Sequence, residues 1–139
     1  MSCRSAVAPA PRPPCALIAD DSAGMRRYVH AILTSAGFDC VEACDGAEAF
    51  NIVLAGGIDL VVTDLDMPEM DGFGLLSAIR LMPPRSRPPV VVVSGLLDET
   101  LAERRPELRA AVSLLAKPVQ PGDLLRAVAR ATGAQLPSS

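Results

Sequence analysis

The chain has 139 residues, of which 50% are hydrophobic, 3% are aromatic and none is tryptophan, so we expect one domain with an aliphatic core. The formal net charge of −3 argues against a nucleic-acid partner, which usually requires a basic excess. No apolar run approaches the roughly 20 residues of a membrane-spanning helix, and the first residues lack the apolar stretch of a signal peptide. We therefore expect a cytoplasmic protein that does not bind membranes.

The four cysteines indicate reduced structural thiols rather than a metal site. No two of them form a Cys-x-x-Cys pair, and the single histidine of the chain leaves too few soft ligands for an ordinary zinc site. The four are Cys3, Cys15, Cys40 and Cys44.

The two ends of the chain differ in composition from its middle. Residues 1–14 are rich in proline and hold little that could pack, so we expect a disordered leader. Residues 134–139 are expected to form a short tail. The folded domain is predicted over residues 15–133, where no internal repeat and no output domain is visible.

Apolar runs and helical patterns alternate through the first half of the domain. We expect a strand at 15–20, a helix at 22–37, a strand at 38–45 and a helix at about 47–54. Ser22 can cap the first helix, because its hydroxyl can accept a hydrogen bond from a free backbone N–H there. Gly56-Gly57 can end the second helix.

The second half continues the alternation. We expect a strand at 58–64, a helix at 72–82, a proline-rich loop at 83–89, a strand at 89–95, a helix at 97–111, a strand at 113–118 and a helix at 121–133. Pro106 interrupts the helix at 97–111. Because proline lacks a backbone donor and clashes with the preceding turn, this helix should stop near Arg104 and restart after the proline.

Five strands that alternate with five helices predict an α/β fold. The strands at 15–20, 58–64 and 89–95 are nearly all apolar, as expected when helices cover both faces of a parallel sheet. Right-handed crossovers then favour a doubly wound sheet. In such sheets, ligands bind beyond the carboxyl ends of the strands.

Polar residues gather at those strand ends. Asp20-Asp21 ends the first strand, Asp64 the third, Ser94 the fourth and Lys117-Pro118 the fifth. Each alone has an ordinary interpretation: the acids can cap helices, the serine can form a turn, and the lysine can be a surface residue. Together they bring three carboxylates, a hydroxyl and an ammonium to one point, which indicates a functional site.

Such a set suits phosphoryl transfer to a carboxylate. Clustered acids repel one another unless a hard cation such as Mg²⁺, which takes oxygen ligands, lies between them. The cation and the lysine can offset charge on the phosphoryl oxygens, and the serine can donate a hydrogen bond to them. The product would be an acyl phosphate on one aspartate.

The stretches LIADDS, VVTDLDMPEMDG, VVVVSG and SLLAKP resemble the four motif regions of the response-regulator receiver domain, in order and spacing. The resemblance covers about residues 15–133, and DLDMPEMDG after an apolar strand is highly specific. It implies a flavodoxin-like, five-stranded parallel sheet in the order 2-1-3-4-5. It also implies a single-domain regulator similar to those of chemotaxis.

The resemblance implies a role for each acid. Asp64 would be the phosphoacceptor and also a magnesium ligand. Asp21 would bind Mg²⁺ directly, with Asp20 assisting through water, and the backbone carbonyl of Asp66 would be a further ligand. Glu69 and Asp71 would belong to the following turn and helix start.

The resemblance also assigns Ser94 to a phosphoryl oxygen as the conformational switch, and Lys117 to the phosphoryl group. A cis peptide is implied at Lys117-Pro118, where the cis form costs only about 0.5–1 kcal/mol. Leu114 departs from the family, which often has Tyr or Phe there, so the aromatic readout of the switch is in doubt. Leu96 and the Asp66 side chain flank the expected path of the attacking water and should tune hydrolysis.

Five arginines lie late in the chain, and three interpretations of them are open: Arg104, Arg105, Arg109, Arg126 and Arg130. They can belong to solvated helix faces interleaved with glutamates. They can form a docking face for a partner, because receivers commonly use the surface of the fourth helix, fifth strand and fifth helix. They can also bind an anionic nucleotide messenger, because arginine binds phosphate through paired hydrogen bonds.

The single histidine, His30, lies in the helix predicted at 22–37. A phosphohistidine would suit an all-helical transfer domain, which this chain is not, so we interpret His30 as an exposed helix residue. The helix itself borders the acidic residues and is the expected docking surface for a phosphodonor.

The leading hypothesis is a two-component response regulator, which takes a phosphoryl group from a histidine kinase or histidine phosphotransfer protein and signals to an unknown downstream protein. We expect a monomer, with dimerisation on phosphorylation as an alternative. Beyond self-catalysed phosphorylation and slow autodephosphorylation, we expect no enzyme activity. Two alternatives stay open: a scaffold that works without phosphorylation, and a haloacid-dehalogenase-type phosphatase that would use Asp64-Leu65-Asp66.

Overall fold

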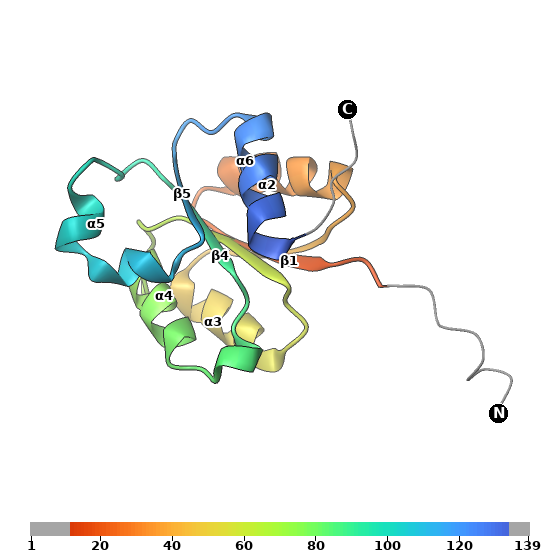
Figure 1. Cartoon of the computed structure of the whole chain (residues 1–139). Helices are drawn as coiled ribbons and strands as arrows, with labels where there is room; N and C mark the ends of the chain where they lie inside the picture. Colours follow the sequence, from red (N-terminus) through yellow and green to blue (C-terminus); the bar gives the residue numbers. More distant parts are fainter. Residues whose placement is uncertain (1–11, 134–139) are drawn as a thin grey trace, which may run out of the picture.

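The computed structural model describes residues 12–133, so most of the expected leader and the whole tail at 134–139 lie outside the described residues. Five parallel strands form one sheet in the order β2-β1-β3-β4-β5, between two layers of helices (Figure 1). The predicted doubly wound fold and its strand order are therefore confirmed. The strands are β1 (Cys15–Ala19), β2 (Asp39–Ala43), β3 (Leu60–Thr63), β4 (Val90–Ser94) and β5 (Ser113–Ala116).

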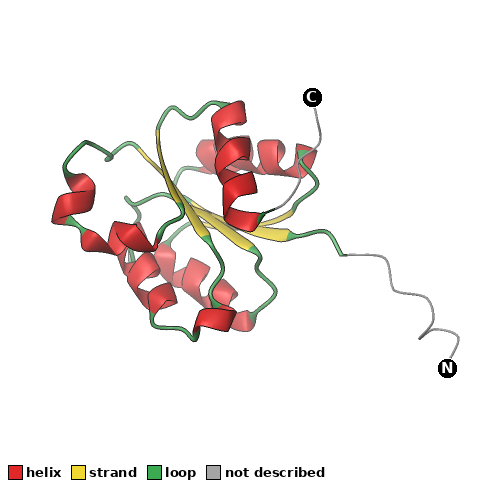
Figure 2. Cartoon of the chain, in the orientation of Figure 1, coloured by secondary structure: helices red, strands yellow, loops and turns green. Residues whose placement is uncertain are grey.

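The helices divide between the two faces of the sheet (Figure 2). They are α2 (Ala23–Ser35), α3 (Gly46–Ala55), α4 (Gly72–Arg80), α5 (Leu101–Arg104), α6 (Pro121–Thr132) and two short 3₁₀ helices, η1 (Pro84–Ser86) and η2 (Pro106–Ala110). One core cluster joins the sheet to α2 and α6. The other joins it to α3, α4, α5 and η2. Among residues 12–133, no helix has the length and apolarity needed to cross a membrane.

The inner strands are apolar throughout because they serve both cores. Leu17 and Ala19 of β1 pack in the cluster of α3 and α4, whereas Ala16 and Ile18 pack in the cluster of α2 and α6. The valines of β4 divide in the same alternating way. Successive strand side chains point to opposite faces, so a strand covered on both sides has no polar face.

Side chains cap the helices that begin beside the carboxyl ends of the strands. The Ser22 hydroxyl accepts from the Met25 N–H at 3.2 Å, which confirms the expected cap of α2. Asp71 accepts from the Gly74 N–H at 2.8 Å and caps α4, as expected. Glu69 has a positive φ of 66° in the preceding turn. These two acids therefore have local structural roles outside the carboxylate cluster.

The helix predicted at 97–111 is shorter and more divided than expected. Its α-helical part is only α5, which ends at Arg104, and η2 begins at Pro106. The break near the proline is confirmed, but the restart is a 3₁₀ helix rather than an α-helix. Proline is tolerated there because the first residue of a helix needs no backbone donor. The loop predicted at 83–89 likewise contains η1.

Gly72 lets the start of α4 lie directly against the backbone that follows β3. Its N–H donates to the Leu65 carbonyl at 2.9 Å. A Cβ at this position would lie 2.7 Å from the Leu65 Cα and still closer to the Asp64 carbonyl oxygen. Both obstacles are backbone atoms, which cannot turn aside as a flexible side chain can. The position of Asp64 is therefore tied to the absence of a side chain at Gly72.

We predict that Gly72→Ala lowers the free energy of unfolding by about 1–3 kcal/mol, the usual effect of forcing extra atoms into a packed region. Urea denaturation measures this change. Gly24→Ala is the matched control, because it also lies in the first turn of a helix but its Cβ would come no closer than 3.9 Å to the Ser22 hydroxyl. The control should be unchanged or more stable by up to about 1 kcal/mol. Equal stability of the two variants would contradict the close approach at Gly72.

Candidate functional site

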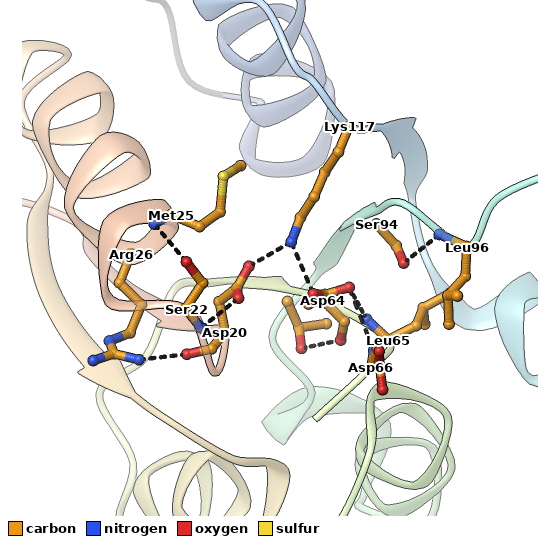
Figure 3. A network of polar contacts seen from close by, with 11 residues as sticks. Asp20, Ser22, Met25, Arg26, Asp64, Leu65, Asp66, Ser94, Leu96 and Lys117 are labelled. Atoms are coloured by element: carbon orange, nitrogen blue, oxygen red, sulfur yellow. Dashed lines mark hydrogen bonds and ion pairs between the residues drawn. The ribbon is translucent and has the colours of Figure 1, made fainter. Parts of the chain in front are cut away.

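The candidate site lies beyond the carboxyl ends of the strands, where the strand order changes direction between β1 and β3 (Figure 3). Asp20 and Asp64 directly follow these two neighbouring strands. The Asp64 N–H donates to the Ala19 carbonyl at 2.9 Å, and the Asp20 N–H donates to the Ala43 carbonyl at 3.1 Å. The sheet hydrogen bonding thus continues to the two acids and holds their backbones side by side.

Lys117 connects the two acids from the end of β5. Its ammonium donates to Asp64 Oδ2 at 2.8 Å and to Asp20 Oδ2 at 3.0 Å. Its backbone N–H donates to the Ser94 carbonyl at 3.1 Å, which fixes the start of the loop against β4. The Lys117-Pro118 peptide is cis, as expected from the sequence. Residues that are 97 positions apart in the chain therefore meet at one ammonium group.

Both carboxylates that contact Lys117 are buried, with 4% of Asp20 and 6% of Asp64 exposed. Burial raises the pKa of Asp20, against the opposing effects of the Ser22 N–H and the Lys117 ammonium. For Lys117, burial lowers the pKa, but hydrogen bonds and charge from Asp64 and Asp20 outweigh it, so the pKa is raised. One ammonium is thus shared by two acids, and the Asp20 pKa indicates that the compensation is incomplete.

Asp21 completes a group of acids that could hold a cation. Carboxylate oxygens of Asp20, Asp21 and Asp64 all lie within 4.8 Å of one another, and this is the one such group of potential ligands within residues 12–133. The donors are all oxygen atoms, which suits a hard cation such as Mg²⁺. Asp21 is exposed, so the group opens to solvent on one side. The residues present therefore fit a magnesium site.

Asp64 itself is held at both oxygens. Its Oδ1 accepts from the backbone N–H groups of Leu65 at 2.6 Å and Asp66 at 3.3 Å, while its Oδ2 accepts from Lys117. The Asp66 side chain is exposed, two residues after Asp64. This arrangement fixes the orientation of one carboxylate at the centre of the group.

Ser94 lies on the other side of Asp64 from Asp20 (Figure 3). It is fully buried at the end of β4, and its hydroxyl accepts from the Leu96 N–H at 3.1 Å. Leu96 is 49% exposed and lies beside the same edge of the site. The structure thus brings Asp20, Asp21, Asp64, Ser94 and Lys117 to one edge of the sheet, as the sequence predicts.

The sequence did not reveal two residues that support the site. Arg26 donates to the Asp20 carbonyl at 2.6 Å and to the Glu42 carboxylate at 3.0 Å, so it braces the turn that carries the acidic pair. The Tyr28 hydroxyl donates to the Val119 carbonyl at 2.8 Å and ties α2 to the loop after Lys117. Only the spacing of Arg26 and His30, four residues apart on one helix face, hinted at a shared partner.

His30 is less free than the sequence suggested. Its side chain is 41% exposed, and its Nδ1 lies 2.8 Å from the Glu42 carboxylate that also pairs with Arg26. The histidine is therefore part of the contact between α2 and β2, about a helical turn beyond the bracing arginine.

The five late arginines do not form one cluster. Three lie on α5, the residue after it and η2, and two lie on α6, which covers the opposite face of the sheet. Arg104 pairs with Asp98 and Arg126 with Asp123. Arg105 pairs with Glu107 and lies 3.5 Å over the Phe73 ring. Arg130 donates to the Ser113 hydroxyl at 3.3 Å, so most of the five already have polar partners.

Leu114 lies on β5 and is 38% exposed. It borders a groove of about 270 Å³, whose lining is apolar except for Asp98 and comes from the loop before α5, from α5, η2 and β5. The position where the family often has an aromatic residue therefore faces an open apolar groove beside the candidate switch.

Comparison with known proteins agrees with this geometry. The sequence model of the response regulator receiver domain family matches residues 16–129 of the chain. A probable transcriptional regulator, ycf27, of Porphyridium aerugineum is 34% identical over 108 residues, which are 78% of this chain and 43% of that protein. A protein-glutamate methylesterase/protein-glutamine glutaminase of Archaeoglobus fulgidus is 39% identical over 104 residues, 73% of this chain and 29% of that protein. The chain thus spans less than half the length of these curated relatives.

Solved structures give the same result. The chemotaxis protein CheY4 of Vibrio cholerae superimposes with a TM-score of 0.76 at 29% sequence identity, over 86% of this chain and 99% of that chain. The chain therefore belongs to the response regulator receiver domain family, whose members are signalling domains of two-component systems rather than classical enzymes.

Proposed function

We propose that this receiver accepts a phosphoryl group on Asp64, from a histidine kinase or a histidine phosphotransfer protein, in a reaction that depends on Mg²⁺. The observation that carries the proposal is the position of the buried Asp64 carboxylate, held by two backbone N–H groups and Lys117 within a group of three acids. Family membership supports the same role. The haloacid-dehalogenase alternative has no support from the family match.

The residues of this chain divide the work of the transfer. A carboxylate oxygen of Asp64 forms a bond to phosphorus while the bond from phosphorus to the donor nitrogen breaks, and the nitrogen keeps the electron pair. The Lys117 ammonium pairs with a phosphoryl oxygen, and the Ser94 hydroxyl donates to another. The ammonium already contacts Asp64, whereas the Ser94 hydroxyl must leave its contact with the Leu96 N–H to reach the phosphoryl group.

Asp21, Asp20 and the Asp66 backbone carbonyl would hold the magnesium ion. When bound, the cation would offset negative charge on the carboxylates and on the incoming phosphoryl oxygens. Two of the three carboxylates are buried with one ammonium between them, which favours the uptake of a further positive charge.

The signal would leave through the surface formed by α5, η2, β5 and α6. Movement of Ser94 toward the phosphoryl group would release its contact with the Leu96 N–H. The loop after β4 would then rearrange, and with it the groove beside Leu114, which Leu97 of this loop lines. A leucine can change rotamer there but offers neither a ring nor a hydroxyl to a partner. We propose that the partner recognises the shape of this groove, beside which Arg104 of α5 pairs with Asp98 of the groove lining.

We predict that acetyl phosphate with Mg²⁺ adds one phosphoryl group to the protein, and that Asp64→Asn abolishes the adduct because the amide is not nucleophilic. Intact-protein mass spectrometry measures the adduct. Asp66→Asn is the matched control and should still be phosphorylated. A wild-type chain that never acquires the group would instead favour a scaffold that works without phosphorylation.

The decay of the adduct in Asp66→Asn and Leu96→Ala tests the effect of these two side chains on hydrolysis, and unchanged lifetimes of the adduct would contradict that effect.

We predict opposite effects of Asp20→Asn with and without magnesium. Burial raises the pKa of folded Asp20, so the folded state binds this proton more tightly than the unfolded state. Stability is then lost as pH rises from the usual aspartate pKa through the raised one, and the ionised group destabilises the protein at pH 7. Without magnesium, Asp20→Asn should therefore raise the midpoint of thermal unfolding.

Added Mg²⁺ should stabilise the wild type by about 2.7 kcal/mol at a hundred times its Kd, and Asp20→Asn should lose most of this gain. Asp39→Asn on β2, an exposed acid outside the group, is the control and should respond to Mg²⁺ as the wild type does. An equal increment in Asp20→Asn and the wild type would show that the cation binds elsewhere.

We predict that beryllofluoride, a mimic of the phosphoryl group, changes which proteins the chain captures in a pull-down. Leu114→Asp should abolish the state-dependent capture while leaving phosphorylation of Asp64 intact, because a charge in an apolar groove opposes docking. Leu54→Asp places the same charge at a site that is 56% exposed on α3, which packs against β1 and β2, toward the sheet edge opposite to β5. Loss of capture in both variants would argue against this surface.

A further inference from the structure

A second cavity lies at the end of the sheet opposite to Asp64. It has a volume of about 510 Å³. Its walls come from the last residues of α4, the loop before β4, η2 and the last turn of α6. Val90, the first residue of β4, lies at its floor, whereas the candidate phosphorylation site lies beyond the last residues of the strands. The two sites are therefore separated by the length of the sheet.

Three arginines line this cavity from three different segments: Arg80, Arg87 and Arg109. None of them has a carboxylate partner among residues 12–133, in contrast to Arg104 and Arg126. Arg87 donates through Nε to the Met82 carbonyl at 2.8 Å, which orients its guanidinium. No acidic residue lines the cavity. Positive charge thus gathers at one hollow of a chain whose net charge is −3, which favours an anion there.

The remaining lining of the cavity is almost entirely apolar. Leu76 and Ile79 of α4 form one wall, and three prolines contribute flat, rigid surfaces: Pro88, Pro89 and Pro106. The fixed φ of proline keeps these surfaces in place. Cavities of roughly 300–1,000 Å³ with an apolar lining and a few charged groups are typical of small-molecule sites. A guanidinium group binds phosphate or carboxylate through two parallel hydrogen bonds, and it also stacks on flat rings.

We propose that this arginine pocket, formed by Arg80, Arg87 and Arg109 over the apolar wall, binds a small anion with a flat apolar body. Nucleoside phosphates and aromatic carboxylates or sulfonates share this chemistry. The structure thus assigns an anion site to a different set of arginines from the five that lie late in the chain, and only Arg109 belongs to both sets. The site is independent of phosphorylation at Asp64.

Isothermal titration calorimetry of the full chain tests the proposal. The probes are ADP, adenosine and inorganic phosphate, together with 8-anilinonaphthalene-1-sulfonate as an aromatic anion without phosphate. EDTA in the buffer prevents magnesium from bridging a phosphate to the acidic site. We expect ADP or the sulfonate to bind at one site, more tightly than adenosine or phosphate alone, because the pocket offers both charge and an apolar wall. Absence of binding by ADP and the sulfonate up to about 1 mM would overturn the proposal.

Substitutions locate the site. Arg80→Gln and Arg109→Gln should each weaken binding by about five- to tenfold, since each removes a charge-assisted hydrogen bond at an accessible position. Arg104→Gln and Arg126→Gln change exposed arginines outside the pocket and should leave the affinity unchanged. Circular dichroism checks that all four variants fold. An equal loss in all four would indicate unspecific attraction and overturn the proposal.

A glutamate-rich peptide separates the small ligand from a protein partner. We expect the peptide to bind no more tightly than inorganic phosphate. If it binds tightly and depends on Arg80 and Arg109, while ADP and the sulfonate do not bind, the pocket belongs to an acidic protein segment and the small-ligand proposal is wrong.

Discussion

The contact on which the site depends is the Lys117 ammonium between the buried carboxylates of Asp20 and Asp64. Two such acids side by side in a poorly hydrated place repel each other, and an unpaired buried charge is far more costly than a paired one. A single ammonium offsets only part of this cost, because burial, and to a smaller extent the charge of Asp64, still raises the pKa of Asp20. The pocket therefore favours the uptake of a further positive charge, which supports the proposed magnesium ion and the proposed phosphoryl transfer at the same place.

The rest of the fold serves to keep these groups in register. The sheet hydrogen bonds extend to Asp20 and Asp64, and the Ser94 carbonyl holds the backbone of Lys117. Gly72 permits the close approach of α4 to the backbone of Asp64 and Leu65. The alternating cores on both faces of β1 and β4 leave the strands little freedom to shift. The positions of the polar groups thus depend on the packing of aliphatic residues that take no part in the chemistry.

The sequence was sufficient for features that depend on local pattern and on a general rule of the fold. Apolar runs predicted the strands, and Ser22 predicted the start of a helix. The rule that ligands bind at the carboxyl ends of parallel strands predicted that Asp20, Asp64, Ser94 and Lys117 lie together. The sequence could not supply contacts between residues distant in the chain, such as the Tyr28 hydroxyl with the Val119 carbonyl, because neither residue type requires that partner. It also grouped arginines by position in the chain, whereas Arg80, Arg87 and Arg109 meet only after folding.

The Tyr28 hydroxyl has a consequence for how robust the pocket is. It fastens α2, which begins just after the acidic pair, to the loop just after Lys117. Two contacts therefore join the same two segments of the chain. The Lys117–Asp20 ion pair joins them inside the pocket, and the Tyr28–Val119 hydrogen bond joins them outside it. If the Lys117 ammonium turns from Asp20 toward another anion, the Tyr28–Val119 hydrogen bond can stay in place, because the two contacts share no atom. The pocket can exchange its inner partners without coming apart.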